Sequence, residues 1–233
     1  SDLNITMWKI SVKIERGGVN LNYLLGLMPQ VLEGLKVTLE IFILTLVLSI
    51  PLGIIVGLMR TSKSIILRKI SGAYVLIMRG TPLLLQIIVI FFGLPLLGIT
   101  FDRFPSAIIA FTLNYGAYFG EIFRAGIQSI DEGQIEAAEV LGITPKDTFF
   151  RIILPQAFKT VLPPVANEIT TLVKDTSLVY IVGMDELLKV GKIASNRDVS
   201  LLPLLVVGAV YLIVIGILSK LLKKLEYKYD YYK

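Results

Sequence analysis

The chain has 233 residues, of which 55% are hydrophobic and 18% charged, and its mean hydropathy is +0.75. This composition is too apolar for a soluble domain of that length and predicts an integral membrane protein. The chain has no cysteine and no histidine, which excludes disulfides, thiolate or imidazole metal sites and nucleophile–histidine catalysis. A net charge of +5 is compatible with nucleic-acid binding, but in a membrane chain it more often reflects cytoplasmic loops rich in lysine and arginine.

Two features precede the first predicted span. Residues 1–20 lack the basic, apolar and small-residue regions of a secretory signal, so we interpret them as an N-terminal extension. From Asn22 to Leu32 apolar residues recur at helical spacing in a stripe that is broken by Pro29, which favours a short interfacial helix. The apolar stretch from Gly34 to Met59 then predicts the first membrane span.

The second apolar region, Ser64 to Leu97, is too long for one straight span and is interrupted by Arg79-Gly80-Thr81-Pro82. We therefore expect one crossing made of two half-helices. Three further spans are predicted at Phe104–Gln128, at Ala157–Gly183 with a bend at Pro163-Pro164, and at Leu201–Ser219. The expected fold is an all-α membrane domain over residues 21–222, with five transmembrane helices, two of them kinked, a polar loop at 129–156 and a Lys/Tyr tail at 223–233.

The loops indicate the orientation. If the N-terminus lies outside and the C-terminus in the cytoplasm, the inner loops and tail carry more lysine and arginine than the outer segments, as the positive-inside rule requires. The tyrosines and lysines of the tail are then anchors at the inner membrane surface, and we expect no nucleic-acid partner.

The loop at 129–156 has the signals of two short helices that meet at a corner. Gln134 to Leu141 are mostly good helix formers, and Gly142 is placed to end that helix in a left-handed conformation. Thr144 can cap a second helix that has Pro145 at its first position, and Asp147 sits where a capping-box acid would. The sequence therefore predicts a rigid helix pair at 129–156.

The same loop carries a family resemblance. Glu136-Ala137-Ala138, then Gly142, then Ile152-x-Leu154-Pro155 fill every position of the pattern that resembles the EAA loop of ABC-importer membrane subunits. Four further stretches are similar to permeases for polar amino acids: 79–83, 120–127, 133–134, and 167–168 with 174–178. The residues that the resemblance assigns to ATPase coupling are Glu136, Ala137, Ala138, Gly142 and Pro155.

The resemblance implies a mechanism and partners. The EAA helix docks on cytoplasmic ATP-binding subunits, whose ATP-driven closure rocks two paired membrane subunits, identical or related. An extracytoplasmic substrate-binding protein is expected to meet the outer loops around 102–104 and 184–200. The sequence has no Gly-x-x-x-x-Gly-Lys-Ser/Thr pattern, so we expect ATP and Mg²⁺ on the partner ATPase, no cofactor on this chain and no enzyme activity of its own.

Polar residues within the predicted spans mark a candidate substrate site, because charges at the bilayer centre need partners or a water-filled cavity. Thr81 is expected to cap the second half-helix with Pro82 at its first position, and the exposed N–H groups and Arg79 suit an amino-acid carboxylate. The alternative is a packing kink with Arg79 paired to a buried acid. Gln86, one turn beyond Pro82, is a candidate neutral contact.

Two polar stripes complete this site. Asn114, Tyr118 and Glu121 share one helix face, while Glu168, Thr171 and Asp175 share another. Carboxylates without a partner suit a cationic substrate such as arginine, lysine or histidine, and glutamine or another polar amino acid is the alternative substrate. The acids could instead have a structural role, and Arg124 could neutralise Glu121. The alternative function is that of an ion-coupled carrier or channel. The predicted substrate-binding residues are Arg79, Thr81, Gln86, Asn114, Tyr118, Glu121, Asn167, Glu168 and Asp175.

Overall fold

The computed structural model describes residues 21–229, so the predicted extension at 1–20 and residues 230–233 of the tail lie outside the described residues. All regular structure within 21–229 is helical, which confirms the all-α prediction for that part. The elements are α2 (Leu21–Thr61), α3 (Ile65–Gly80), α4 (Leu83–Ile88), the π-helical turn η1 (Val89–Gly93), the 3₁₀ turn η2 (Leu94–Leu97), α5 (Arg103–Gln128), α6 (Glu132–Val140), α7 (Pro145–Asp147), the π-helical turn η3 (Thr148–Ile153), α8 (Leu154–Asp175), the 3₁₀ turn η4 (Thr176–Val182), α9 (Leu187–Asp198) and α10 (Leu202–Tyr229).

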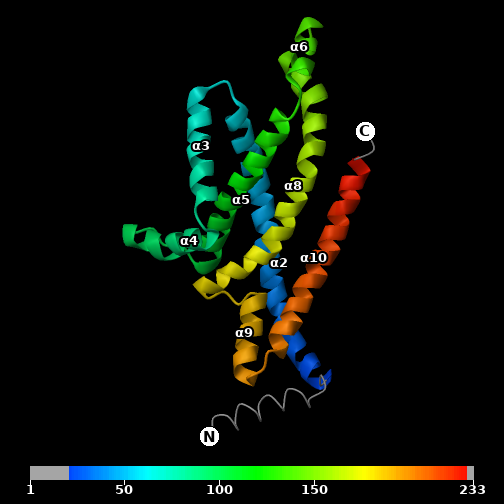
Figure 1. Ribbon diagram of the computed structural model, residues 1–233. Coiled ribbons are helices and arrows are strands. Elements are labelled where there is room, and N and C mark those ends of the chain that lie inside the picture. Colours follow the sequence, from blue (N-terminus) through cyan, green and yellow to red (C-terminus); the bar gives the residue numbers. More distant parts are fainter. Residues whose placement is uncertain (1–20, 230–233) are drawn as a thin grey trace, which may run out of the picture.

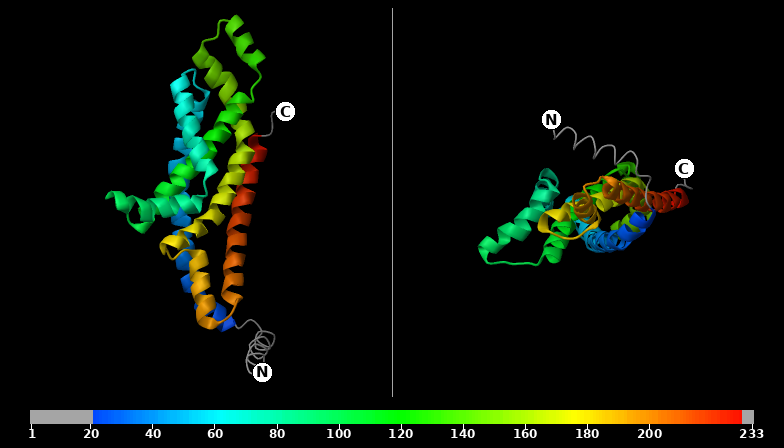
Figure 2. Two further views of the ribbon diagram at one scale, coloured as in Figure 1. Left: turned by 60° about the vertical axis from the view of Figure 1, so that its left-hand side comes forward. Right: turned by 90° about the horizontal axis from the view of Figure 1, so that it is seen from below.

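The long helices form an elongated bundle. In Figure 1, α2, α5, α8 and α10 run side by side, α6 extends beyond one end, and α9 lies towards the other end. The start of α2 lies at the α9 end, whereas α10 finishes towards α6, and the turned view in Figure 2 shows the same arrangement. The two ends of the described chain therefore point towards opposite ends of the bundle.

The interfacial helix expected before the first span is not a separate element. Instead α2 is one continuous helix of 41 residues that contains Pro29 and Pro51, about 60 Å long at 1.5 Å per residue. Proline removes one helical hydrogen bond and bends the helix, but packing can hold the two sides together. Leu27 and Val31, which flank Pro29, are fully buried in a cluster with Leu187 of α9. The prediction of a break at Pro29 was therefore wrong.

The interruption of the second apolar region lies where it was predicted, but the two halves are not collinear. α3 and the α4–η2 segment are bent by 101° at the break, and α4 projects sideways from the bundle (Figure 1). Thr81 is extended, as expected for a residue before proline. α2, α10 and this bent pair have the length and apolarity of membrane spans. α8 continues through Pro163 and Pro164 and then tightens into η4.

The centre of the bundle is the contact between α2 and α5. A Cβ atom added at Gly53 would lie 2.5 Å from the Cβ of Phe119, and one added at Gly120 would lie 2.5 Å from a methyl carbon of Val56. Phe111, Tyr115 and Phe119 of α5 are buried in the same core. Small residues thus let the two backbones approach closely, which is how helices pack within membranes.

Candidate functional site

The corner between α3 and α4 is closed by three of the predicted site residues. The Gln86 side-chain amide donates to the Thr81 hydroxyl at 2.9 Å and to the Met78 carbonyl at 3.0 Å. Asn114 of α5 donates to the same Met78 carbonyl at 2.9 Å and to the Gln86 side-chain oxygen at 3.1 Å. These side chains therefore join the corner to α5, and their hydrogen-bond donors are used within the protein.

Thr81 does not cap α4 as predicted. Its hydroxyl donates to the Ile77 carbonyl at 2.8 Å, so Thr81 ends α3, while Pro82 occupies the N-cap position of α4 with no side-chain cap. The prediction of a threonine cap followed by proline at the first helical position was wrong by one residue. Because Pro82 is itself extended, its ring lies before the first helical turn.

Four charged or phenolic groups gather on the flank of the bundle beside this corner. The Arg79 guanidinium lies over the ring of Tyr118, 5.0 Å from its centroid, in a cation–π contact. On α8, Asp175 accepts a 2.8 Å hydrogen bond from the buried Tyr115 hydroxyl of α5. Glu168 is half-buried, and the charges that act on it are those of Asp175 and Arg79. Within residues 21–229 the Glu168 carboxylate has no hydrogen-bond or ion-pair partner. The structure thus brings Arg79, Tyr118, Glu168 and Asp175 together.

Glu121 belongs to a separate ion-pair cluster. Arg124 binds one of its carboxylate oxygens at 2.8 and 2.5 Å, and Arg60 of α2 lies 3.6 Å from the other. The three side chains are 19–27% exposed. Glu121 is therefore flanked by two arginines, and its pair with Arg60 links α5 to α2. The oxygen that faces Arg60 accepts no hydrogen bond within residues 21–229.

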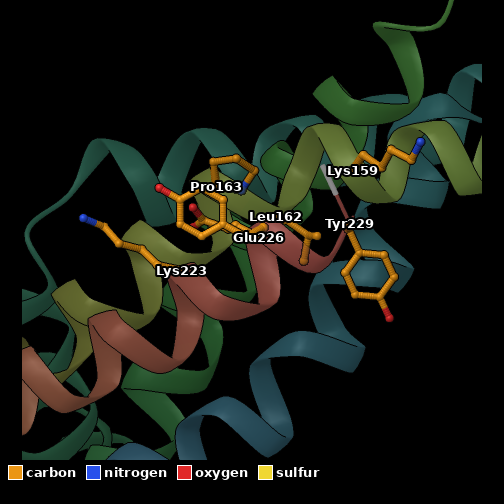
Figure 3. Close-up of a pocket in the computed structure, with 7 residues that line it drawn as sticks. Lys159, Leu162, Pro163, Lys223, Glu226 and Tyr229 are labelled. Atoms are coloured by element: carbon orange, nitrogen blue, oxygen red, sulfur yellow. The ribbon is translucent and has the colours of Figure 1, made fainter. Parts of the chain in front are cut away.

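Asn167 points elsewhere. It lines a hollow between α8 and α10, together with Thr170, Ser219 and Lys223. One helical residue corresponds to a rotation of about 100°, so Asn167 and Glu168 face different surfaces of α8. The adjoining hollow in Figure 3 is lined by Lys159, Leu162, Pro163, Lys223, Glu226, Tyr227 and Tyr229. Asn167 is thus not part of the group around Arg79.

The loop at 129–156 folds as its residues predict. Asp131 caps α6 by accepting from the Gly133 N–H at 2.7 Å. Gly142 has φ +72°, and its N–H and that of Ile143 donate to the Glu139 and Ala138 carbonyls at 2.9 Å, which closes the helix end as a Schellman motif. The Thr144 hydroxyl accepts from the Asp147 N–H at 3.2 Å and donates to the Asp147 carboxylate at 2.8 Å.

The tip of this loop is apolar and exposed, which was not predicted from the sequence. Val140 and Leu141 are 88% and 76% exposed, at the end of α6. Glu136 and Ala137 are exposed too, whereas Ala138 is buried. Gln134 and Gln156 exchange side-chain hydrogen bonds at 2.7 and 3.3 Å, which hold α6 against the start of α8. Two consecutive apolar residues just before Gly142 were the available sequence signal. We call residues 131–147 the coupling corner, after the role that the family resemblance implies for this loop.

The other end of the bundle holds a polar network that the sequence did not indicate. Glu186 is fully buried, caps α9 through the Leu188 and Lys189 N–H groups at 2.6 and 2.7 Å, and accepts from the Tyr211 hydroxyl of α10 at 3.2 Å. At the far end of α9 the Tyr23 hydroxyl donates to Asp198 at 2.5 Å. Hydrogen bonds from Arg197 and then from Tyr23 lower the pKa of Asp198 to about 2. α9 is therefore fastened to both α2 and α10.

Comparison with known proteins decides the family. Residues 49–226 match the family described as the binding-protein-dependent transport system inner membrane component. The chain belongs to this family. It is 38% identical over 202 residues to the arginine transport system permease protein ArtQ of Bacillus subtilis (strain 168), covering 86% of this chain and 92% of that protein. It is 39% identical over 206 residues to the L-cystine transport system permease protein TcyB of the same organism, covering 88% of each chain.

Other relatives widen the range of named substrates. A putative glutamine transport system permease protein GlnP of Rickettsia typhi (strain ATCC VR-144 / Wilmington) is 36% identical over 214 residues, which cover 89% of this chain and 98% of that protein. A solved amino acid ABC transporter with histidines superposes with a TM-score of 0.84 at 31% identity, covering 91% of this chain and all of the other. The MetNI methionine ABC transporter, with a TM-score of 0.71 at 19% identity, covers 88% of this chain and 98% of that one and shares the fold. The resemblance to amino-acid ABC permeases is confirmed.

Proposed function

We propose that this chain is the permease subunit of an ATP-driven importer and forms the membrane path for a polar, cationic amino acid such as arginine, lysine or histidine. The observation that carries the choice of substrate is the pair of carboxylates, Glu168 and Asp175, on the flank of the bundle beside Arg79. Asp175 is held by Tyr115, while Glu168 is left to meet a substrate. The relatives named for arginine and for histidines support this choice; those named for cystine and glutamine keep the neutral alternatives open.

The roles of the two signs of charge follow from amino-acid chemistry. A free amino acid carries a carboxylate, which the Arg79 guanidinium can bind through two parallel hydrogen bonds. A cationic side chain needs a negatively charged acceptor that is not already paired, and in this proposal the Glu168 carboxylate is that acceptor. Thr81, Gln86 and Asn114 act in this proposal as the support that fixes the α3–α4 corner, since their donors already bind one another and the Ile77 and Met78 carbonyls.

A second permease subunit, identical or related, completes the path. Arg79 is exposed and Glu168 half-buried on the side of a single chain, and at the centre of a bilayer each charge facing lipid would cost roughly 2.5 to 3.5 kcal/mol. A facing subunit that encloses a water-filled cavity between the two chains removes this cost. The N-terminus is then outside, where a substrate-binding protein delivers the amino acid, and the C-terminus is cytoplasmic.

Movement is driven by separate ATP-binding subunits, which carry the ATP and Mg²⁺. In our proposal the coupling corner docks on them, with Glu136, Ala137 and Ala138 on its helix, Gly142 at its turn and Pro155 at the base of the loop. The exposed side chains of Val140 and Leu141 enter the partner's surface. The capped, hydrogen-bonded corner can transmit a displacement because it is rigid.

Competition between substrates tests the proposal. The complex of this chain with its ATPase and binding protein is reconstituted in vesicles, and uptake of labelled arginine is measured against unlabelled arginine, glutamine and cystine. Glu168→Gln removes the unpaired charge at nearly constant volume and should abolish the preference for arginine over glutamine. Asn167→Ala, on the neighbouring residue that faces α10, should leave that preference unchanged. Unaltered competition in Glu168→Gln contradicts the assignment.

A further inference from the structure

A groove between α8 and α10 is used by none of the proposed steps. Its walls are Lys159, Leu162 and Pro163 of α8 and Lys223, Glu226 and Tyr229 of α10. Two adjoining hollows continue it in both directions along the helices. The part in Figure 3 has a volume of about 280 Å³, close to the lower limit of about 300 Å³ for small-molecule sites.

The groove lies where the apolar part of α10 ends. The apolar run of this helix reaches Ser219, and lysines follow at positions 220, 223, 224 and 228. Towards Leu154 and Pro155 the groove continues past an edge-to-face contact between Phe158 and Tyr229, whose ring centroids are 5.2 Å apart. Lysine and tyrosine directly after an apolar helix lie at the level of the lipid headgroups. The groove therefore opens sideways at the boundary between the bilayer and water.

The residues that line the groove differ along its length. Lys159 and Lys223 lie at opposite ends, with Pro163, Leu162 and Glu226 between them (Figure 3). Flexible lysine side chains can turn towards a phosphate, and basic pockets between helices at a membrane surface bind anionic headgroups. The Glu226 carboxylate only accepts hydrogen bonds when ionised, so it suits the hydroxyl groups of a headgroup. Leu162, Pro163 and Leu222 offer an apolar wall for an acyl chain.

We propose that this groove binds an anionic phospholipid with a hydroxylated headgroup, of the phosphatidylglycerol type. The phosphate lies against Lys223 at one end of the groove, the glycerol hydroxyls donate to Glu226, and Lys159 at the other end attracts the anionic lipid through its charge. A second copy of the chain is a poorer occupant, because an isologous two-fold interface would place Lys159 and Lys223 of both copies in one contact surface. The site is separate from the group around Arg79, so it can exist whether or not the transported substrate is a cationic amino acid.

Lipid retention tests the site. The full chain is reconstituted in vesicles of equal parts phosphatidylglycerol and phosphatidylethanolamine and extracted in mild detergent, and retained lipid per chain is measured by mass spectrometry. The wild type should retain phosphatidylglycerol in clear excess. Removing each groove lysine should weaken retention roughly five-fold, so Lys159→Gln with Lys223→Gln should abolish the excess. Lys220→Gln with Lys224→Gln removes the same charge from positions of α10 that do not line the groove, and this variant should keep the excess.

Four results would overturn the proposal. An equal loss in both double variants would mean attraction to the basic surface as a whole. Release of the retained lipid by millimolar inorganic phosphate, with phosphate bound in its place, would mean a site for a free anion. Because the chain has no cysteine, Ser219→Cys reports a second copy directly, and rapid disulfide dimerisation in phosphatidylglycerol vesicles would place that copy in the groove. Retained excess in Lys159→Gln with Lys223→Gln would equally contradict the assignment.

Discussion

The hydroxyl of Tyr115 donates a 2.8 Å hydrogen bond to the carboxylate of Asp175 and so joins α5 to the end of α8. Tyr115 is 2% exposed and packs against Phe111 and Phe119. The apolar surroundings fix the ring, and the ring fixes the carboxylate. Asp175 is therefore held in place, whereas the Glu168 carboxylate has no hydrogen-bond or ion-pair partner within residues 21–229.

Tyr115→Phe removes this hydrogen bond and leaves the ring in place. A hydrogen bond to a charged group contributes roughly 1.5 to 3 kcal/mol, so we expect a loss of that order in the free energy of unfolding and a rise in KM for the substrate. Denaturation of the detergent-solubilised chain and uptake kinetics check both effects. Wild-type stability together with wild-type KM would mean that the bond holds nothing in place.

The ion pairs of Glu121 and Glu40 should differ in their contribution to stability. Glu121→Gln leaves Arg60 and Arg124 with reduced compensation in a site that is 19–27% exposed. The partial exposure lowers the expected cost to about 1 to 3 kcal/mol of unfolding free energy. The Glu40 and Lys36 side chains are 48% and 77% exposed, and their charged atoms are 3.9 Å apart. Glu40→Gln should therefore change the free energy of unfolding by less than about 1 kcal/mol.

These two substitutions are compared in one thermal denaturation series. The larger effect of Glu121→Gln should shrink when Arg124→Gln is added, because the second change removes one of the uncompensated charges. Equal effects of Glu121→Gln and Glu40→Gln would contradict a structural role for the Glu121 cluster.

The contact between α2 and α5 leaves no room at Gly53. A Cβ atom there would lie 2.5 Å from Phe119 Cβ and 3.1 Å from the Gly120 nitrogen, so Gly53→Ala must push the helices apart and should cost about 1 to 3 kcal/mol. Gly208→Ala on α10 meets nothing within 4 Å and should be neutral or slightly stabilising through helix propensity. Folded yield and melting temperature distinguish them, and a tolerated Gly53→Ala would show that the helices are packed less closely.

Local signals predicted the coupling corner, whereas tertiary contacts decided the rest. The stop at Gly142 and the cap at Thr144 depend on residues within five positions, so the sequence contains everything they need. Thr81 followed by Pro82 is an equally good local signal for a helix start. In the structure, however, the Thr81 hydroxyl donates to the Ile77 carbonyl and accepts from the Gln86 side-chain amide, and no local pattern specifies these bonds. The continuity of α2 through Pro29 likewise depends on packing against α9, far along the chain.

For the acidic residues of α8, too, the sequence predicted the local arrangement but not the tertiary contacts. Their helical spacing predicted a shared face for Glu168 and Asp175, and the structure places them together. The partner of Asp175 was missed because Tyr115 lies in an apolar stretch and is 60 residues away. Asn167 was included because it adjoins Glu168 in sequence, yet adjacent helical positions face different directions. Periodicity predicts which residues share a face, and only the folded bundle determines which residues that face meets.

The central claim is that ATP hydrolysis on a separate subunit drives amino-acid uptake through this chain by way of the coupling corner. The most direct measurement is ATPase activity and uptake in vesicles that contain this chain, its ATPase and its binding protein, with wild type and Gly142→Asp compared. Gly142 has φ +72° and open space around it, so aspartate strains the turn without a steric clash. We predict substrate-stimulated hydrolysis coupled to uptake in the wild type and hydrolysis without uptake, or neither, in Gly142→Asp. Uptake that needs no ATPase and follows an ion gradient alone would contradict the account.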